Sequence, residues 1–360
     1  MHNMPKSFFC ISLSCMLIAC DTSFVVIGDA PYDDKDEIML QEAINAISPN
    51  NARSPYPFVI HIGDYKASSE PCDDEIDARF ESLIDELSPV PVFYTPGDNE
   101  WVDCDSYKIK PDTEQRSELA RLKSIRTKFF RAHPANSAAF GYSSQTIQPE
   151  NGSWHHARIR FITLHVTGTK TGREWVTFKG DDAVSAGILA DARDKANIIW
   201  LRKSFSLAKK EDAGAVVISM HADINILRAE YFEERYEYGK PCAGATKNAR
   251  TDNCDAFVGL RVALLNEVKN FDGPVLLIHG DTRPFALAKI FTEGGESSDL
   301  WSLNAAGDAK CNNGRTEGIS NATVVKVNLR SSHPFDASRL LDREFLCQRS
   351  SGSSPIPSDS

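Results

Sequence analysis

The sequence lacks the patterns that mark several common classes of protein. Its 360 residues contain no Gly-x-Ser-x-Gly elbow, no P-loop and no Gly-x-Gly-x-x-Gly fingerprint, which excludes the usual α/β-hydrolases, P-loop nucleotide hydrolases and dinucleotide-binding enzymes. No two cysteines have the Cys-x-x-Cys spacing of a zinc ribbon or a redox site. The 40 basic and 50 acidic residues give a net charge of -10 and form no basic stripe, so no nucleic-acid partner is expected.

The first twenty residues differ from the rest of the chain. Lys6 precedes the apolar stretch FFCISLSCMLIA, which is too short for a membrane span and predicts an export signal over residues 1–19. The ending Leu17-Ile18-Ala19-Cys20 resembles the bacterial lipobox, in which Cys20 would be acylated and become the first mature residue. Plain secretion is the alternative, although Leu17 suits an ordinary signal-peptidase site poorly. We therefore expect an exported protein: periplasmic or membrane-anchored through Cys20 if bacterial, otherwise secreted.

The remaining cysteines support export independently. Without Cys10, Cys15 and Cys20 an even set remains, and in an exported chain such a set predicts disulfides. The pairing cannot be deduced from the sequence alone. The pairing we predict is Cys72–Cys104, Cys242–Cys254 and Cys311–Cys347, of which the first would join two loops that follow neighbouring strands.

Short runs rich in Val, Ile and Phe alternate with segments of helical spacing, which predicts an α/β fold with a largely parallel sheet. A late strand at 323–329 should be antiparallel and near an edge. One domain over residues 20–348 is the simplest interpretation, with long loops at 102–156, 223–255 and 284–320 and a disordered tail at 349–360. The predicted strands are 24–28, 57–62, 91–95, 158–166, 214–219 and 274–279, and the predicted helices are 35–48, 73–87, 114–131, 186–210 and 256–270.

Four of the apolar runs end in Gly-Asp, with the aspartates at Asp29, Asp64, Asp98 and Asp281. Glycine allows a sharp turn where the strand stops, and the aspartate then lies at the carboxyl edge, where open α/β sheets bind ligands. Carboxylates that converge on one edge repel one another unless a cation compensates them. Gly-Asp is also common in ordinary turns, but four pairs after buried-type strands favour a metal-centred site.

The order of these elements is informative. It runs Gly28-Asp29, Gly63-Asp64, a Pro-Gly-Asp-Asn-Glu turn at 96–100, a strand followed by His221, and a strand followed by Gly280-Asp281. This order resembles the calcineurin-like metallophosphoesterase superfamily across residues 24–285, and GDYKASSEPC and TPGDNEWVDC are similar to an exported subgroup with a Gly-Asp-Asn-Glu-Trp motif. The resemblance implies a four-layer α/β/β/α sandwich that hydrolyses phosphate mono- or diesters with one or two divalent metal ions.

The resemblance also implies a ligand set. Asp29 would bind a first metal, Asp64 would bridge two metals, and Asp98, His221 and Asp281 would bind the second. Carboxylates with one imidazole suit Mn, Fe, Zn or Mg without selecting among them.

Five positions depart from the family pattern. Asp98 stands where the family has a metal-binding asparagine and Asp281 where it has a histidine, and both keep an oxygen ligand for a metal. Pro31 and Arg283 stand where the family has metal-binding histidines, and Asn99 replaces the histidine that assists the leaving group. Asparagine can hydrogen-bond a phosphate but cannot transfer a proton, which lowers the rate by about 10²–10⁴. From these departures we predict that Asn99 and Arg283 act on the substrate. Arg283 would supply positive charge beside Asp29 and hold a phosphate oxygen bidentately, at a site with one metal or a weakly bound second one.

These departures leave three functional alternatives. The first is an exported metal-dependent phosphoesterase that acts on a small phosphorylated substrate. The second is a degenerate, non-catalytic member that binds a phosphorylated or anionic ligand at the cell envelope. The third is a structural lipoprotein without a site, in which the four aspartates would be scattered.

Other polar residues support weaker hypotheses. His61 and His279 lie inside apolar strands, which favours hydrogen-bonded structural histidines over ligands. His155 and His156 are expected on a loop surface. Lys66 could meet a substrate, although a solvated lysine is the commoner case, and Glu100 could orient Asn99.

Overall fold

The structure is a computed structural model of the chain. It describes residues 21–48, 53–105, 117–173, 182–224, 239–242, 254–282, 285–291, 297–307, 309–312 and 315–343. Among these residues, no helix is both long enough and apolar enough to cross a membrane. The predicted export signal, Cys20 and the tail lie outside the described residues.

The first sheet has five strands in the order β14-β13-β1-β2-β3. The strands β1 (Asp21–Ile27), β2 (Val59–His61) and β3 (Val92–Tyr94) are parallel. The late strand β13 (Thr323–Asn328) pairs antiparallel with β1, and β14 (Phe335–Arg339) pairs antiparallel with β13 at the edge. The predicted antiparallel strand at 323–329 is therefore confirmed.

The second sheet has seven strands in the order β4-β5-β6-β7-β8-β10-β9. Its centre, β6-β7-β8-β10, is parallel, and antiparallel strands flank it on both sides. The strands are β4 (Ser143–Ser144), β5 (Gly152–His156), β6 (Ile159–Thr163), β7 (Ala215–Ser219), β8 (Val275–His279), β9 (Ala286–Phe291) and β10 (Ser297–Asn304).

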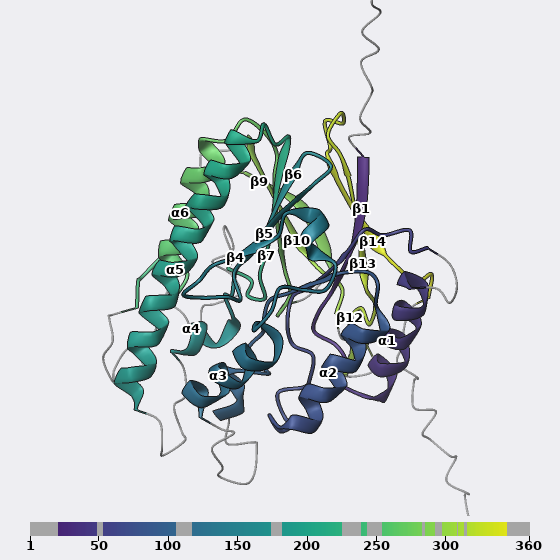
Figure 1. Cartoon of the computed structure of the whole chain (residues 1–360), viewed down its shortest axis with the longest axis vertical. Helices are drawn as coiled ribbons and strands as arrows, with labels where there is room; N and C mark the ends of the chain where they lie inside the picture. Colours follow the sequence, from purple (N-terminus) through teal and green to yellow (C-terminus); the bar gives the residue numbers. More distant parts are fainter. Residues whose placement is uncertain are drawn as a thin grey trace, which may run out of the picture.

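Helices cover the outer face of each sheet, so the molecule has four layers, α/β/β/α (Figure 1). On one side α1 (Asp34–Ile47) and α2 (Asp74–Glu86) cover the first sheet, and each begins after an aspartate N-cap that accepts backbone N–H groups. On the other side α5 (Ala183–Lys210) and α6 (Val258–Lys269) cover the second sheet. The fold class predicted from the resemblance, a four-layer sandwich, is thus confirmed. The remaining helices are α3 (Glu118–Phe129), the short α4 (Gly168–Gly172) and two 3₁₀ turns, η1 (Val102–Asp105) and η3 (Ser137–Phe140).

The alternation of side chains along β1 shows how the layers pack. Phe24 and Val26 point between the two sheets, whereas Val25 and Ile27 point toward the helices α1 and α2. All four are apolar because both faces of the strand are buried. The ring of Phe58 lies among other aromatic rings between the sheets, 5.0 Å from Phe161 between ring centroids.

The predicted helices and strands all occur, with shifts of a few residues at their ends. The long loops predicted at 102–156 and 284–320 are wrong in part. The first contains β4 and β5, so His155 and His156 lie in a strand, and the second contains β9 and β10 together with the hairpin β11 (Ala309–Asn312) and β12 (Arg315–Gly318). Their apolar stretches are short and interrupted by polar residues, such as Lys289 in β9 and Ser302 in β10.

Candidate metal centre

Five ionisable side chains meet at the carboxyl ends of strands from both sheets. Asp29, Asp64 and Asp98 follow β1, β2 and β3 of the first sheet, and His221 and Asp281 follow β7 and β8 of the second. Among the described residues, Asp29, Asp64 and His221 offer ligand atoms within 4.8 Å of one another, and so do Asp98, His221 and Asp281. The scattered arrangement expected for a protein without a site is therefore not the one found.

His221 is the side chain that both groups share. Its ring is fully buried, and Nδ1 donates to the carbonyl oxygen of Ile62 at 3.0 Å. Nε2 therefore faces the carboxylates, 2.8 Å from Asp98 Oδ1 and 3.4 Å from Asp64 Oδ1. It has no hydrogen-bond partner of acceptable geometry among the described residues. A hydrogen-bonded Nδ1 that leaves Nε2 to a ligand is typical of a metal-binding histidine.

The carboxylates line a cavity of about 410 Å³. Tyr32, Ser68, Ser69 and Thr282 contribute hydroxyl groups to its wall, and Phe285 contributes an apolar side chain. No lysine or arginine lines the described part of this cavity. Because the wall is acidic, an anionic ligand can enter only when a cation offsets its charge.

The burial of the cluster changes its protonation. Burial raises the pKa of Asp64 well above its usual value, and the nearby carboxylates of Asp98 and Asp29 raise it further. Asp281 is exposed at the cavity wall, and its pKa is also raised, by desolvation within the cluster first and then by the carboxylate of Asp98. Burial alone would lower the pKa of His221, but the carboxylates outweigh it and hold the pKa well above the usual range. The raised pKa values favour proton binding by the metal-free cluster, and a cation bound there would compete with those protons.

Three of the aspartates that follow the strands have an unusual backbone conformation. Asp29, Asp64 and Asp281 have φ angles of 52°, 56° and 62°, in the left-handed region that aspartate tolerates better than most residues. Gly280, before Asp281, was expected to make the turn, but it has no positive φ. A side chain at Gly280 would instead collide with the carboxylate of Asp29, so this glycine permits close approach.

Gly168 lies against the other side of the cluster. A Cβ at this position would lie 2.5 Å from Asp281 Oδ2 and 2.7 Å from Asp98 Oδ2. Gly168 is the first residue of α4, and the loop that carries it follows β6 in the second sheet. The site thus requires a residue without a side chain here. Nothing in the local sequence, VTGTKTG, distinguishes this glycine from an ordinary loop glycine.

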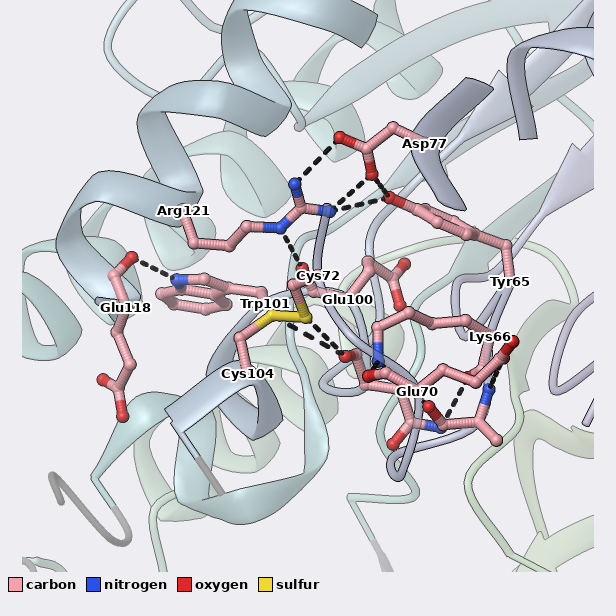
Figure 2. Close-up of a disulfide and its surroundings, with 12 residues drawn as sticks. Tyr65, Lys66, Glu70, Cys72, Asp77, Glu100, Trp101, Cys104, Glu118 and Arg121 are labelled. Atoms are coloured by element: carbon pink, nitrogen blue, oxygen red, sulfur yellow. Dashed lines mark hydrogen bonds and ion pairs between the residues drawn. A yellow bond between two sulfur atoms is a disulfide. The ribbon is translucent and has the colours of Figure 1, made fainter. Parts of the chain in front are cut away.

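Glu100 supports the turns that carry Asp64 and Asp98. Its buried carboxylate accepts the N–H of Asp64 at 3.0 Å, the N–H of Gly97 at 2.8 Å and the hydroxyl of Tyr94 at 2.9 Å. Glu100 was expected to orient Asn99; it orients the backbone on either side of the site instead. Arg121 of α3 donates Nε to the carbonyl oxygen of Glu100 at 2.7 Å, as Figure 2 shows.

Lys66 was expected to be solvated, but its side chain is fully buried. Its Nζ donates to the carbonyl oxygens of Ala67 and Glu70, both at 2.9 Å, and so it closes the loop after Asp64 (Figure 2). Burial lowers the pKa of Lys66 to about 8, and the carboxylates of Glu100 and Asp64 oppose this shift. Lys66 is therefore a structural part of the site and does not line the cavity.

The disulfide Cys72–Cys104 joins the loops that follow β2 and β3. Its two sulfur atoms lie 3.6 and 3.9 Å from the carbonyl oxygen of Asn99, the residue that follows Asp98. The predicted pairs Cys72–Cys104 and Cys242–Cys254 are both present in the structure. The predicted pair Cys311–Cys347 involves Cys347, which lies outside the described residues.

Asn99 lines the cavity, but both hydrogens of its amide are donated within the protein. Its Nδ2 donates to the hydroxyl of Tyr32 at 3.1 Å and to the carbonyl oxygen of Lys66 at 3.0 Å, which uses both of its hydrogens. Arg283, the other predicted substrate-binding residue, lies outside the described residues. Tyr32, which lines the cavity between Asp29 and Asp64, was missed in the sequence. The only available signal was its place three residues after a strand-terminal Gly-Asp.

The two structural histidines lie as predicted, away from the ligand set. His61 is fully buried and accepts the N–H of Gly63 on Nδ1 at 3.2 Å. His279 contacts the hydroxyl of Ser302 through Nε2 at 3.1 Å.

The fold and the site together define an α/β/β/α protein with a candidate metal centre at the strand ends. No family model matches the sequence, and the comparison with curated proteins finds no match. Among solved structures the chain is similar to TT1561 of Thermus thermophilus, at 11% sequence identity and a TM-score of 0.36, over 89% of this chain and 99% of that one.

Proposed function

We propose that the chain hydrolyses phosphate mono- or diesters with a bound divalent cation. The observation that carries this proposal is the position of His221 Nε2, which is buried 2.8 Å from Asp98 Oδ1 and 3.4 Å from Asp64 Oδ1 while Nδ1 is held by the carbonyl oxygen of Ile62. A buried polar nitrogen in a carboxylate cluster is stable only if a cation or a proton lies beside it. The residues present therefore fit a divalent cation held by Asp64, Asp98, His221 and Asp281.

The chain's own groups account for binding and positioning. A divalent cation bound there supplies a Lewis acid that polarises a phosphoryl oxygen. The hydrogen bond from His221 to Ile62 holds the imidazole in the tautomer that binds metals. The hydroxyls of Ser68 and Ser69 can donate to phosphate oxygens from the cavity wall. The cavity volume of about 410 Å³ suits a small ester.

A second candidate function is a binding protein for a phosphorylated or anionic ligand at the cell envelope. Asn99 favours it, because both amide hydrogens are already donated to Tyr32 and Lys66. The position where the resemblance expects a proton-transferring histidine therefore has no proton to give. Arg283, if it binds a phosphate oxygen as predicted, would serve either function.

Turnover of an aryl phosphate ester with added Mn²⁺ or Zn²⁺ separates the two functions. For the enzyme, His221→Ala abolishes turnover, whereas His155→Ala, which changes an exposed histidine of β5, leaves it unchanged. For the binder, neither protein turns over the ester, yet wild type retains phosphate in a metal-dependent manner. Equal activity in wild type and His221→Ala would reject the proposed site.

The proposed compartment is the cell exterior or envelope, with Cys20 as the lipid-bearing residue in a bacterial host. The apolar stretch before Cys20 and the two disulfides support this proposal. Metabolic labelling with a fatty acid tests it, because Cys20→Ser should abolish the label and release the protein from membranes. An unlabelled wild type that is nevertheless exported would favour plain secretion.

A further inference from the structure

Tyr32 is held rigidly at the wall of the metal centre. Its backbone N–H donates to Asp36 Oδ2 in the first turn of α1 at 3.2 Å. Its hydroxyl donates to Asp64 Oδ2 at 2.7 Å, lies 3.4 Å from Asp29 Oδ1, and accepts a hydrogen from Asn99 Nδ2 at 3.1 Å. The phenol oxygen therefore lies between the two carboxylates, fixed from three directions.

The two oxygens of Asp64 face different neighbours. Oδ1 lies 3.4 Å from His221 Nε2 and accepts the backbone N–H of Asn99 at 3.0 Å. Oδ2 accepts the hydroxyl of Tyr32. A carboxylate that bridges two cations must give one oxygen to each. Here the oxygen on the side of Asp29 receives a hydrogen from the protein, at the place where a second cation would have to bind.

The imidazole can serve only one cation. His221 uses Nδ1 for the carbonyl oxygen of Ile62, so Nε2 is its single ligand atom. Nε2 is closer to Asp98 Oδ1, at 2.8 Å, than to Asp64 Oδ1, at 3.4 Å. A cation bound by His221, Asp98, Asp281 and Oδ1 of Asp64 would leave only Asp29 and Oδ2 of Asp64 for another ion. Those two carboxylates are the ones that Tyr32 contacts.

We propose that Tyr32 limits this centre to one divalent cation, because its hydroxyl occupies the position between Asp29 and Asp64 that a second cation would take. This inference rests on the proposed function only in requiring that the first cation binds. Tyr32 is thus a residue that determines the metal stoichiometry. Asn99, which stands where the resemblance expects a histidine, acts by holding the phenol oxygen in place.

The test is the number of Mn²⁺ ions bound per full-length chain, measured by isothermal titration and by metal analysis after dialysis. Wild type should bind one ion. Tyr32→Phe removes only the hydroxyl and Tyr32→Ala opens the position fully, so both variants should bind two ions, with the electron paramagnetic resonance signal of a spin-coupled Mn²⁺ pair. Tyr56→Phe, at a half-buried tyrosine remote from the cavity, should still bind one.

Three outcomes would overturn the inference. Two tight ions in wild type would show that the hydroxyl does not exclude the second ion. One ion in both Tyr32 variants, with circular dichroism spectra like that of wild type, would show that something else sets the count. No bound ion in wild type would reject the metal centre itself, and with it the proposed function, which the first two outcomes leave intact.

Discussion

The backbone N–H of Asp64 donates to the side-chain carboxylate of Glu100, 36 residues away along the chain, at 3.0 Å. The same carboxylate accepts the N–H of Gly97, next to Asp98. A single buried anion therefore sets the spacing between the turns that carry two of the candidate ligands. Since metal affinity depends on that spacing, Glu100 should control the metal centre without touching the metal.

Glu100→Gln should weaken metal binding by about 10–100-fold and destabilise the protein by about 1–3 kcal/mol. Glutamine keeps one acceptor oxygen but turns an NH₂ group toward a backbone N–H, which then has no acceptor. The dissociation constant of Mn²⁺ and the visible spectrum of the Co²⁺-loaded protein measure the effect. Glu81→Gln, at an exposed position of α2, is the matched control and should change neither. An unaltered Co²⁺ spectrum in Glu100→Gln would show that the carboxylate has no positioning role.

Gly168→Ala should weaken metal binding by about tenfold or more. The added carbon would lie 2.5 Å from Asp281 Oδ2 and 2.7 Å from Asp98 Oδ2, so at least one carboxylate must move. Such overpacking lowers the free energy of unfolding by about 1–3 kcal/mol. Titration with Mn²⁺ measures the loss. In the control Gly259→Ala the new carbon meets only Ile198 Cδ1 at 3.6 Å on the exposed face of α6, and the change should raise stability by about 0.5–1 kcal/mol. Equal metal affinity in both variants would contradict the geometry.

Removing the disulfide with the double change Cys72→Ala and Cys104→Ala should lower stability by about 3–4 kcal/mol, given a separation of 32 residues. Metal affinity should fall as well, because the bond joins the loops after β2 and β3. Guanidinium unfolding and metal titration measure the two effects. The pair Cys242→Ala and Cys254→Ala should lower stability and leave metal affinity unchanged. A loss of affinity of the same size in both pairs would point to a general effect of destabilisation.

Asp77 and Arg121 form an ion pair beside the turn that carries Glu100 (Figure 2). From this ion pair we predict that acid destabilises the part of the fold that supports the metal centre. Burial alone would raise the pKa of Asp77, but hydrogen bonds from Arg121 outweigh it and lower the pKa from 3.8 to about 2. Because the folded-state pKa is below the unfolded one, the folded state favours the charged carboxylate. Its stabilisation is complete above about pH 4 and is lost as the pH falls toward 2.

Urea unfolding at a series of pH values tests whether the free energy of unfolding falls with pH in this direction. Asp77→Asn should lower stability near neutral pH by about 3–5 kcal/mol, since it leaves Arg121 buried without its counter-charge. The difference from wild type should shrink between pH 4 and pH 2. Asp74→Asn removes an exposed partner of Lys128 and should have little effect at any pH. A constant difference for Asp77→Asn across that range would mean that its titration is not coupled to folding.

The sequence predicts a helix or strand well in two cases. Either both faces of the element are apolar, or apolar residues recur along one face at a regular spacing. Strands such as FVVI at 24–27 have a continuous apolar run, and their parallel arrangement follows from the helices between them. The gathering of Asp29, Asp64 and Asp98 follows in turn, because the carboxyl ends of parallel strands lie at one edge. Strand β5, by contrast, reads GSWHH, and only its pairing with β6 makes it a strand.

The contacts that shape the site depend on tertiary approach and leave no local signal. Tyr32 follows a proline in a loop, and Gly168 lies in one of several glycine-containing turns; only the folded chain shows that they touch the carboxylates. Lys66 is buried against expectation because two carbonyl oxygens of its own loop accept its amine hydrogens. Such pairings require coordinates, since side-chain type alone predicts the commoner, solvated state.

The candidate ligands come from both sheets, with Asp64 and Asp98 on one and His221 and Asp281 on the other. A cation shared among them would be a cross-link between layers that otherwise adhere through apolar side chains such as Phe58 and Phe161. The packing of the two sheets against each other and the binding of the cation are then thermodynamically coupled. Truncating an aromatic ring in the interior, far from any carboxylate, should weaken the binding of the ion, and ion loading should slow hydrogen exchange across the whole interface.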